Sequence, residues 1–364
     1  MDFIDDVNIK AKKSTWIFYF DVLRVIACLA VIMIHTSAHY VTGSDLGSFN
    51  FWAGNFFDSI SRIGVPIFVM ISGALMLDEN YDFSIKKLLG HIIKIIVFYV
   101  FWSAVYSIVG NIVVPIIKNR SINIKSVILA FISGSYHLWF CFMIIGLYLL
   151  VPLLRLWIKK QNKKFIEYFL ILAFLFNFLL PQIIRILGYY TDKFNFINEM
   201  MDKVNLKYVM GYIPYFILGW YLHNFEFKYK KTLYLLGVFG LCFTVLMTYI
   251  FSKTTGRLIT EYSNLSINVL LQTTALFVAI KSIYGKHITN TTPKFDKSIL
   301  FISKNSLGVY AIHAEIITLC YVAIKTLPLY YAIINIICIF IIALTISLLA
   351  SFLIRKIPLL KNIV

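Results

Sequence analysis

The sequence predicts an all-α membrane protein, a bundle of about ten transmembrane helices. Apolar residues make up 60% of the 364 residues, charged residues only 14%, and the mean hydropathy is +0.81. Soluble domains carry nearly twice that share of charge. A water-soluble fold of this size could not hide so much apolar surface, so the bilayer is the solvent in which this chain folds.

Ten apolar runs are candidate spans, because a membrane helix needs about 20 mostly apolar residues. They cover residues 16–37, 56–77, 92–116, 138–157, 165–184, 208–222, 232–251, 265–284, 299–324 and 329–354. The first run lacks a small-residue cleavage site and is expected to be a retained helix. The longest loop, 185–207, is too short to fold alone, and no internal repeat is evident. We therefore expect one domain over 1–364, with a cytoplasmic N-terminal segment over 1–15.

The basic residues predict the orientation of these spans. If the N-terminus is cytoplasmic, the inner segments contain twice as many Lys and Arg residues as the outer ones. This bias follows the positive-inside rule and predicts that both termini are cytoplasmic. We expect the membrane to be the inner membrane of a bacterial cell. The same loops account for the net charge of +17 and would meet anionic membrane lipids, so nucleic acid is not an expected partner.

The pattern of cysteines and histidines argues against disulfide bonds and metal sites. The five cysteines all lie in apolar runs without a CxxC pair, which fits neither a disulfide framework nor a zinc site. His35 and His39 have a spacing that can bind a metal, but only His137 offers itself as a third ligand and no HExxH motif is present. We expect no metal and no permanently bound cofactor.

The first run carries ionisable side chains, which are costly inside a membrane and mark a functional site. Arg24 and His35 are eleven residues apart, close to three helical turns, so they share one face at a separation of about 16 Å. Asp21 precedes Arg24 by three residues and can pair with it. Arg24 would then lie near the cytoplasmic surface and His35 in the outer half. Alternatively, Arg24 snorkels to the interface and His35 caps the outer end.

Polar residues also lie in the second and fourth runs. Arg62 is about ten residues inside the outer loop, too deep to snorkel, and should meet an anion or carbonyl groups. A structural ion pair is the alternative. Tyr136, His137 and Trp139 open the fourth run at its outer end, where an aromatic belt explains the tyrosine and the tryptophan but not the histidine.

The ninth run places two ionisable residues near the bilayer midplane, His313 and Glu315. Glu315 is the only acidic residue expected so deep. It is offset from His313 by about 200° around the helix, so the two side chains should face different neighbours.

Together these segments resemble acyltransferase family 3, the integral membrane O-acyltransferases. The matching pieces keep the family's order and spacing over the whole chain: DVLRVIACLAVIMIH, RIGVPIFVMISGALML, YHLWFCFMIIGLYLLVP, YFILGWYL and SKNSLGVYAIH. The ten residues between Arg24 and His35 are the most specific element. Within the family, the nearest likeness is the branch of the enterobacterial common antigen O-acetyltransferase.

The resemblance implies a donor, acetyl-CoA, used as a co-substrate from the cytoplasm, and an acceptor, a glycan or lipid-linked sugar on the outer side. It also implies His35 as the acid/base centre and Arg24 as its essential basic partner. Many members carry an Arg-x-x-Arg pair where the third helix leaves the cytoplasm. This chain has Lys87, His91 and Lys94 there, and we expect them to bind the donor's phosphates with Arg24.

Thioester-to-hydroxyl transfer needs a base for the alcohol proton and donors for the developing oxyanion. His35 suits the first task, and Arg62, His137 or Tyr136 the second. An acyl-histidine intermediate at His35 is a less favoured variant. The residues expected to contact the acceptor are Tyr136, Trp139, His313 and Glu315.

Two other classes of function remain open. A flippase or exporter of a surface polysaccharide, or of its lipid-linked precursor, would line a conduit with the same Arg and His side chains. An ion-coupled transporter is disfavoured because no inverted repeat is present. The pattern specifies neither the acyl group, nor the acceptor, nor the oligomeric state.

Overall fold

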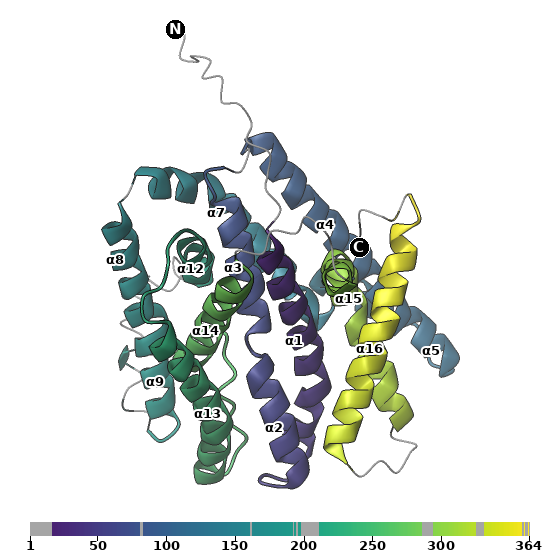
Figure 1. The fold of residues 1–364 in the computed structure, drawn as a ribbon. Helices are drawn as coiled ribbons and strands as arrows, with labels where there is room; N and C mark the ends of the chain where they lie inside the picture. The colour runs from purple at the N-terminus through teal and green to yellow at the C-terminus, as the bar shows by residue number, and fades with distance from the viewer. Residues whose placement is uncertain are drawn as a thin grey trace.

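The computed structural model describes residues 17–80, 83–160, 162–191, 193, 196–197, 211–285, 294–324, 331–358, 360 and 363. These residues form helices and no strands, and they include nine candidate spans, helices or broken helices long and apolar enough to cross a membrane. The spans form one bundle (Figure 1). The all-α polytopic fold predicted from the sequence is confirmed.

Four spans contain an interruption or an irregular turn, and the others are continuous. The continuous spans are α1 (Phe18–Gly43), α13 (Lys230–Thr255), α14 (Ile267–Tyr284), α15 (Lys294–Ile324) and α16 (Ala332–Arg355). The others are α2 (Phe49–Ser61) with α3 (Gly64–Met76), α4 (Ile85–Ile108) with α5 (Val114–Ile117), α6 (Ile124–Ser133) with α7 (Trp139–Lys160), and α8 (Lys163–Ala173) with α9 (Leu180–Gly188). The sixth predicted run, 208–222, overlaps α12 (Ile213–Asn224), whose 12 residues are fewer than a span requires. Residues 208–210 lie outside the described residues.

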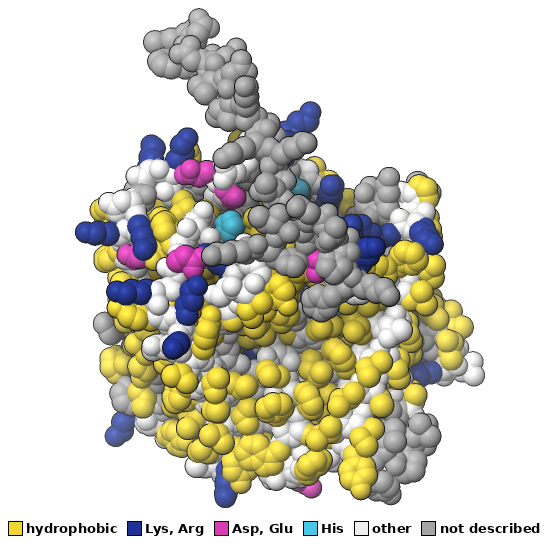
Figure 2. All heavy atoms as spheres, viewed as in Figure 1, with side chains coloured by type: hydrophobic (Ala, Val, Ile, Leu, Met, Phe, Trp, Pro, Cys, Tyr) yellow, Lys and Arg dark blue, Asp and Glu magenta, His cyan; other side chains and the backbone are white. Residues whose placement is uncertain are grey.

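The central helix is α1, which packs against α2, α3, α14, α15 and α16 (Figure 1). The Phe18 end of α1 and the Arg355 end of α16 lie at the same end of the bundle. Arg355 donates to the carbonyl of Lys304, and the neighbouring Ser303 is bonded to Arg24 of α1. Figure 2 shows most of the visible Lys and Arg side chains towards this end, above a band of hydrophobic side chains.

Helix α6 occupies a segment that the sequence analysis left in an outer loop. Asn123 caps its N-terminus by accepting a hydrogen bond from the Ser126 amide at 3.2 Å. Two of its C-terminal carbonyls are bonded by side chains of α4: Tyr99 donates to Ile132 O at 2.7 Å, and Ser103 donates to Phe131 O. Ser107 donates to Val127 O in the first half of the helix at 2.6 Å. A ten-residue helix in a candidate membrane span is stabilised because a neighbour supplies donors for two of its free carbonyls.

Helix α12 lies against α3 at backbone contact distance. A Cβ atom added at Gly73 would overlap the carbonyl of Phe216, and one added at Gly219 would overlap the carbonyl of Met70. Small residues permit this close approach between membrane helices. The contact holds α12 in the bundle although it is too short to be anchored by its own span.

We predict that Gly73→Ala and Gly219→Ala each destabilise the protein by at least about 1–3 kcal/mol, because each added methyl group meets backbone that cannot move aside. The thermal unfolding midpoint in detergent measures the effect. Gly146→Ala on α7 is the matched control, since a Cβ there meets nothing within 4 Å. Equal midpoints for all three variants would contradict the backbone contact.

We also predict the sidedness of the two ends. In a variant without its native cysteines, single cysteines at Asp45 and Tyr190 should react with a membrane-impermeant reagent added outside intact cells. Single cysteines at Lys160 and Tyr229 should react only after lysis, because these residues lie at the other, more basic end. All four positions are exposed. The reverse labelling pattern would place the termini outside.

Candidate active site

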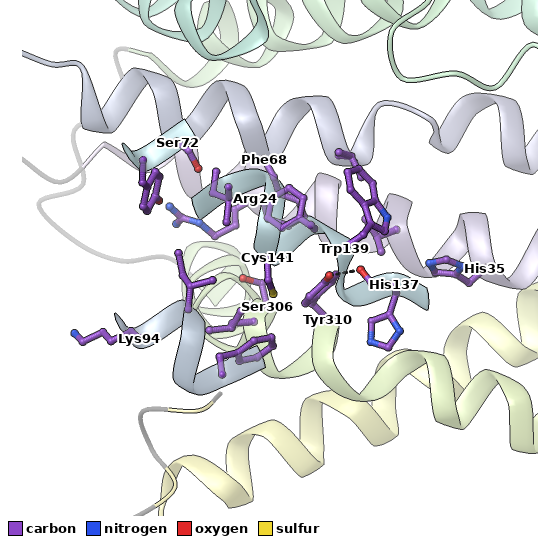
Figure 3. A pocket seen from close by; sticks show the side chains of 18 residues that line it. Arg24, His35, Phe68, Ser72, Lys94, His137, Trp139, Cys141, Ser306 and Tyr310 are labelled. Atoms are coloured by element: carbon purple, nitrogen blue, oxygen red, sulfur yellow. Dashed lines mark hydrogen bonds between the residues drawn. The ribbon is translucent and has the colours of Figure 1, made fainter. Parts of the chain in front are cut away.

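A cavity of about 320 Å³ lies between α1, α3, α4, α7 and α15. Its two ends carry the basic side chains, and its middle is mainly apolar. Arg24 and Lys94 line one end, and His35 and His137 line the other (Figure 3). Because Arg24 and His35 are eleven residues apart on one continuous helix, about 16 Å separates the two ends. The structure therefore places both residues of the most specific sequence element on the wall of one cavity.

The Arg24 side chain is held in place by two partners. Its Nη1 donates to Asp21 Oδ1 at 2.9 Å and to Ser303 Oγ at 3.1 Å, and Ser303 in turn donates to Asp21 Oδ1 at 2.5 Å. The predicted Asp21–Arg24 pair is confirmed. A guanidinium has five N–H donors, so several remain for a ligand in the cavity. Lys94 lines the same end of the cavity and adds a second cation there.

Three histidines from three different helices meet at the opposite end. The ring centroid of His313 on α15 lies 5.3 Å from that of His35 and 5.4 Å from that of His137. The Tyr136 ring lies 5.2 Å from the His35 ring. Both His137 and His313 are buried, and neither Nε2 atom has a hydrogen-bond partner among the described residues.

His137 lies in the break between α6 and α7, and not at the outer end of a continuous helix as the sequence suggested. Gly134 turns the chain with φ 69°, and Tyr136–Leu138 form a single 3-10 turn before α7 begins. The hydroxyl of Tyr310 on α15 donates to the His137 carbonyl (Figure 3). The His137 Nδ1 lies 3.2 Å from Ser135 Oγ. The break thus turns the imidazole into the bundle.

Arg62 lies at the other helix break, between α2 and α3, and does not line the cavity. It forms an ion pair with Asp58, to which its Nε donates at 2.5 Å, and its guanidinium lies 4.3 Å from the centroid of the Tyr262 ring. The structural ion pair weighed from the sequence is therefore the observed arrangement. Asp58 is fully buried within a membrane span, so Glu315 is not the only deep acidic residue.

Some of the other predicted site residues line the cavity and others do not. Trp139 lines the cavity, whereas Tyr136 and His313 do not line it and each contact the His35 ring. Glu315 is half-buried beside Tyr136 and, as expected, faces other neighbours than His313. The predicted donor ligands that do not line the cavity are Lys87 and His91.

Some polar lining residues were not singled out as site residues from the sequence. Ser306 and Tyr310 line the cavity from α15 and Ser72 lines it from α3. Ser306 and Tyr310 are four residues apart and therefore share one helix face. Ser303, which bonds Arg24, precedes Ser306 by three residues on the same face. This spacing was the available signal that the face is polar.

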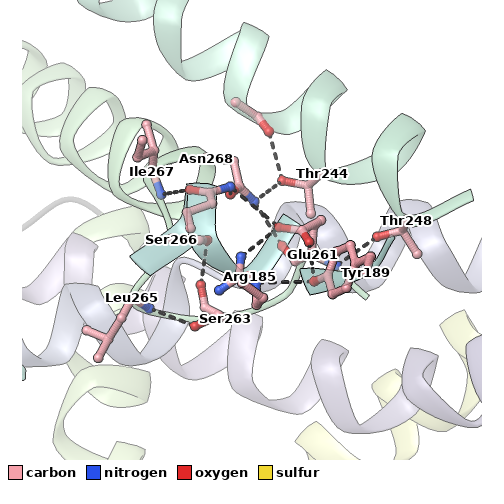
Figure 4. A network of polar contacts seen from close by, with 12 residues as sticks. Arg185, Tyr189, Thr244, Thr248, Glu261, Ser263, Leu265, Ser266, Ile267 and Asn268 are labelled. Atoms are coloured by element: carbon pink, nitrogen blue, oxygen red, sulfur yellow. Dashed lines mark hydrogen bonds and ion pairs between the residues drawn. The ribbon is translucent and has the colours of Figure 1, made fainter. Parts of the chain in front are cut away.

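A second polar cluster joins α9, α13 and the loop before α14 (Figure 4). The buried Glu261 carboxylate accepts hydrogen bonds from Arg185 Nη2 and Tyr189 Oη, both at 2.7 Å. Burial, followed by the bond to Glu261, raises the pKa of Tyr189 to about 12, so the phenol remains a donor. Asn268 donates to the Glu261 carbonyl at 2.9 Å. The cluster is internally satisfied and anchors the loop, and it is not part of the cavity.

The comparison with known families agrees with this geometry. A family model described as an acyltransferase domain matches residues 17–356, a segment that contains every helix lining the cavity. Neither a curated protein nor a solved structure shows a significant match to the chain. The match covers nearly the whole length, from the start of α1 to the end of α16. The chain belongs to acyltransferase family 3 and is a multi-pass membrane acyltransferase.

Proposed function

We propose that this acyltransferase moves an acyl group, most simply acetyl, from cytoplasmic acyl-CoA to a hydroxyl of a cell-surface or lipid-linked glycan, in the inner membrane of a bacterium. The observation that supports the proposal is the single cavity that joins a cationic end to a histidine end. Acyl-CoA matches this arrangement, because it carries phosphates at one end, for the cationic end of the cavity, and a thioester at the other, for the histidine end.

The donor would lie along the face of α1. Arg24 and Lys94 bind the phosphates of CoA at the basic end of the bundle, where charge-assisted contacts are strongest. The apolar middle, which includes Phe68 and Ile144, surrounds the extended arm of the donor. This placement brings the thioester to His35, about 16 Å away along the helix.

His35 then acts as the base for the acceptor hydroxyl. The hydroxyl oxygen attacks the thioester carbonyl carbon while its proton passes to the imidazole, and the C–O bond forms. The C–S bond breaks as the tetrahedral intermediate collapses, and the proton passes from His35 to the departing thiolate. We assign the stabilisation of the oxyanion to His137, which lines the same end.

The cavity favours an enzyme over an exporter. A conduit for a polysaccharide needs hydrogen-bonding groups along its whole length, because sugar hydroxyls lose their water on entering it. The middle of this cavity is lined mainly by apolar side chains such as Ile95, Phe98 and Leu307. Ser306 and Tyr310 supply only a few hydrogen-bonding groups there (Figure 3). We therefore propose acyl transfer and not glycan export.

We predict that Arg24→Ala weakens the binding of acetyl-CoA roughly ten- to a hundredfold, since it removes a charge-assisted contact of about 1.5–3 kcal/mol. Arg24→Lys should restore only part of the affinity, because an ammonium lacks the guanidinium fork. Lys94→Ala should also weaken binding. Calorimetry with purified protein at fixed salt provides the measurement.

Lys87→Ala is the matched control for Lys94→Ala. Both residues lie on α4, but only Lys94 lines the cavity. Normal affinity in the Lys87 variant is the expected result. An equal loss in both variants would place the phosphates outside the cavity, and no binding by the wild-type protein would refute the acyl-CoA donor.

We predict that His35→Ala lowers acyl transfer by about 10²–10⁴-fold, the usual contribution of a general base, while acetyl-CoA still binds. His39→Ala should retain transfer, because His39 does not line the cavity and stacks instead near Tyr321. Mass spectrometry of surface glycans from cells that express each variant measures the acylation. Near-normal acylation by the His35 variant would show that another residue is the base.

A further inference from the structure

His313 is a buried polar group that the proposed reaction has not yet used. Its side chain is 0% exposed and does not line the cavity, so it cannot touch a substrate in this conformation. Its ring nevertheless lies between those of His35 and His137, at centroid distances of 5.3 and 5.4 Å. A polar group enclosed in this way normally has a hydrogen-bond partner for each polar atom.

The two nitrogens of His313 are in different situations. Nδ1 lies 3.0 Å from the carbonyl oxygen of Val309, one turn earlier on α15. A carbonyl oxygen can only accept, so Nδ1 carries the proton and Nε2 of the neutral ring has a free lone pair. This Nε2 has no partner among the described residues. It is a buried acceptor that lacks a donor.

Two neighbouring rings could donate to this lone pair. His137 has Ser135 Oγ at 3.2 Å from its Nδ1, while its Nε2 is buried and has no partner among the described residues. We take His35 as the donor, because no described residue is hydrogen-bonded to its ring, which also contacts the Tyr136 ring and lines the cavity. The centroid distance of 5.3 Å between the His35 and His313 rings is short enough for an N–H to N hydrogen bond after a change in ring orientation.

We propose that His313 is a positioning residue for His35. Its Nε2 accepts a hydrogen bond from one ring nitrogen of His35, which keeps the proton there and leaves the other nitrogen unprotonated and facing the cavity. The carboxylate of a serine hydrolase triad fixes its histidine in the same way. The catalytic part of this inference rests on the proposed acyl transfer, whereas the hydrogen bond itself does not.

The proton balance of the reaction is consistent with this role. The free nitrogen of His35 takes the proton of the acceptor hydroxyl as the new C–O bond forms, and the resulting imidazolium keeps its hydrogen bond to His313. When the C–S bond breaks, the same proton moves from His35 to the thiolate sulfur. His313 keeps its own proton on Nδ1 throughout, so it begins and ends each cycle unchanged.

The first test is spectroscopic and does not depend on the reaction. Nitrogen-15 NMR of protein labelled at histidine, with the His35 signals assigned by comparison with His35→Gln, reports which ring nitrogen is protonated. Wild-type protein should show one predominant His35 tautomer, and His313→Leu should show a mixture. An equal mixture in the wild type, or an unchanged tautomer in a folded His313→Leu variant, would overturn the proposal.

The second test compares two replacements of His313 by rates of CoA release from acetyl-CoA, with surface glycan from a deletion strain as acceptor. His313→Leu removes the acceptor atom, and His313→Gln returns a carbonyl oxygen near the position of Nε2. We expect kcat to fall about a hundredfold or more in the Leu variant, to recover at least about tenfold in the Gln variant, and KM for acetyl-CoA to stay within about twofold.

His39→Leu is the control for replacing a histidine near this end of α1, and its kcat should stay near normal. Equal losses in the Leu and Gln variants, or a change confined to KM, would contradict a positioning role. If the wild type shows a single His35 tautomer but releases no CoA, the acyl transfer proposal fails and the hydrogen bond stands.

Discussion

The distance between the two ends of the cavity is set by a single rigid element, helix α1. Arg24 and His35 are on the same face of this helix, and α1 is enclosed by α2, α3, α14, α15 and α16. A continuous, buried helix cannot stretch or bend without breaking its own hydrogen bonds, because the hydrocarbon layer offers no substitute partners. The other helices therefore supply walls to a cavity whose length α1 has already determined.

Most buried polar groups around the cavity also have a hydrogen-bond partner within the protein, since the membrane supplies none. Where a span is interrupted, side chains from neighbouring helices bond the freed backbone: Ser103 of α4 bonds a C-terminal carbonyl of α6, and Tyr310 bonds the carbonyl of His137. Among the described residues, four buried side-chain atoms lack a partner, and two of them are the Nε2 atoms of His137 and His313 in the histidine cluster; the others are Asp58 Oδ2 and Ser347 Oγ. A buried polar atom without a partner is costly, so two such atoms in one cluster support a functional role for it.

The parts of the structure that could be predicted from the sequence are those encoded by local patterns. Apolar run lengths identified the spans, and helical periodicity placed Arg24 and His35 on one face, since both depend only on nearby residues. Helix α6 was missed because it is shorter than a span and its carbonyl partners lie on α4. The ion pair of Arg62 could have been predicted from the sequence, because Asp58 precedes it by four residues, a spacing that brings two side chains together on a helix. Only its contact with the Tyr262 ring is tertiary and not revealed by a local pattern.

The ion pair between Asp21 and Arg24 also explains how a charged arginine can bind a ligand inside a membrane protein. A free arginine at this depth would extend its side chain to the interface, as arginines near helix ends commonly do. Here Asp21 and Ser303 hold Nη1 of Arg24, and its side chain is only 29% exposed. The carboxylate offsets part of the charge, but it also fixes the guanidinium beside the cavity before a ligand arrives. An anionic donor then gains its contacts without paying the full entropy of ordering the side chain, which is how preorganisation increases affinity.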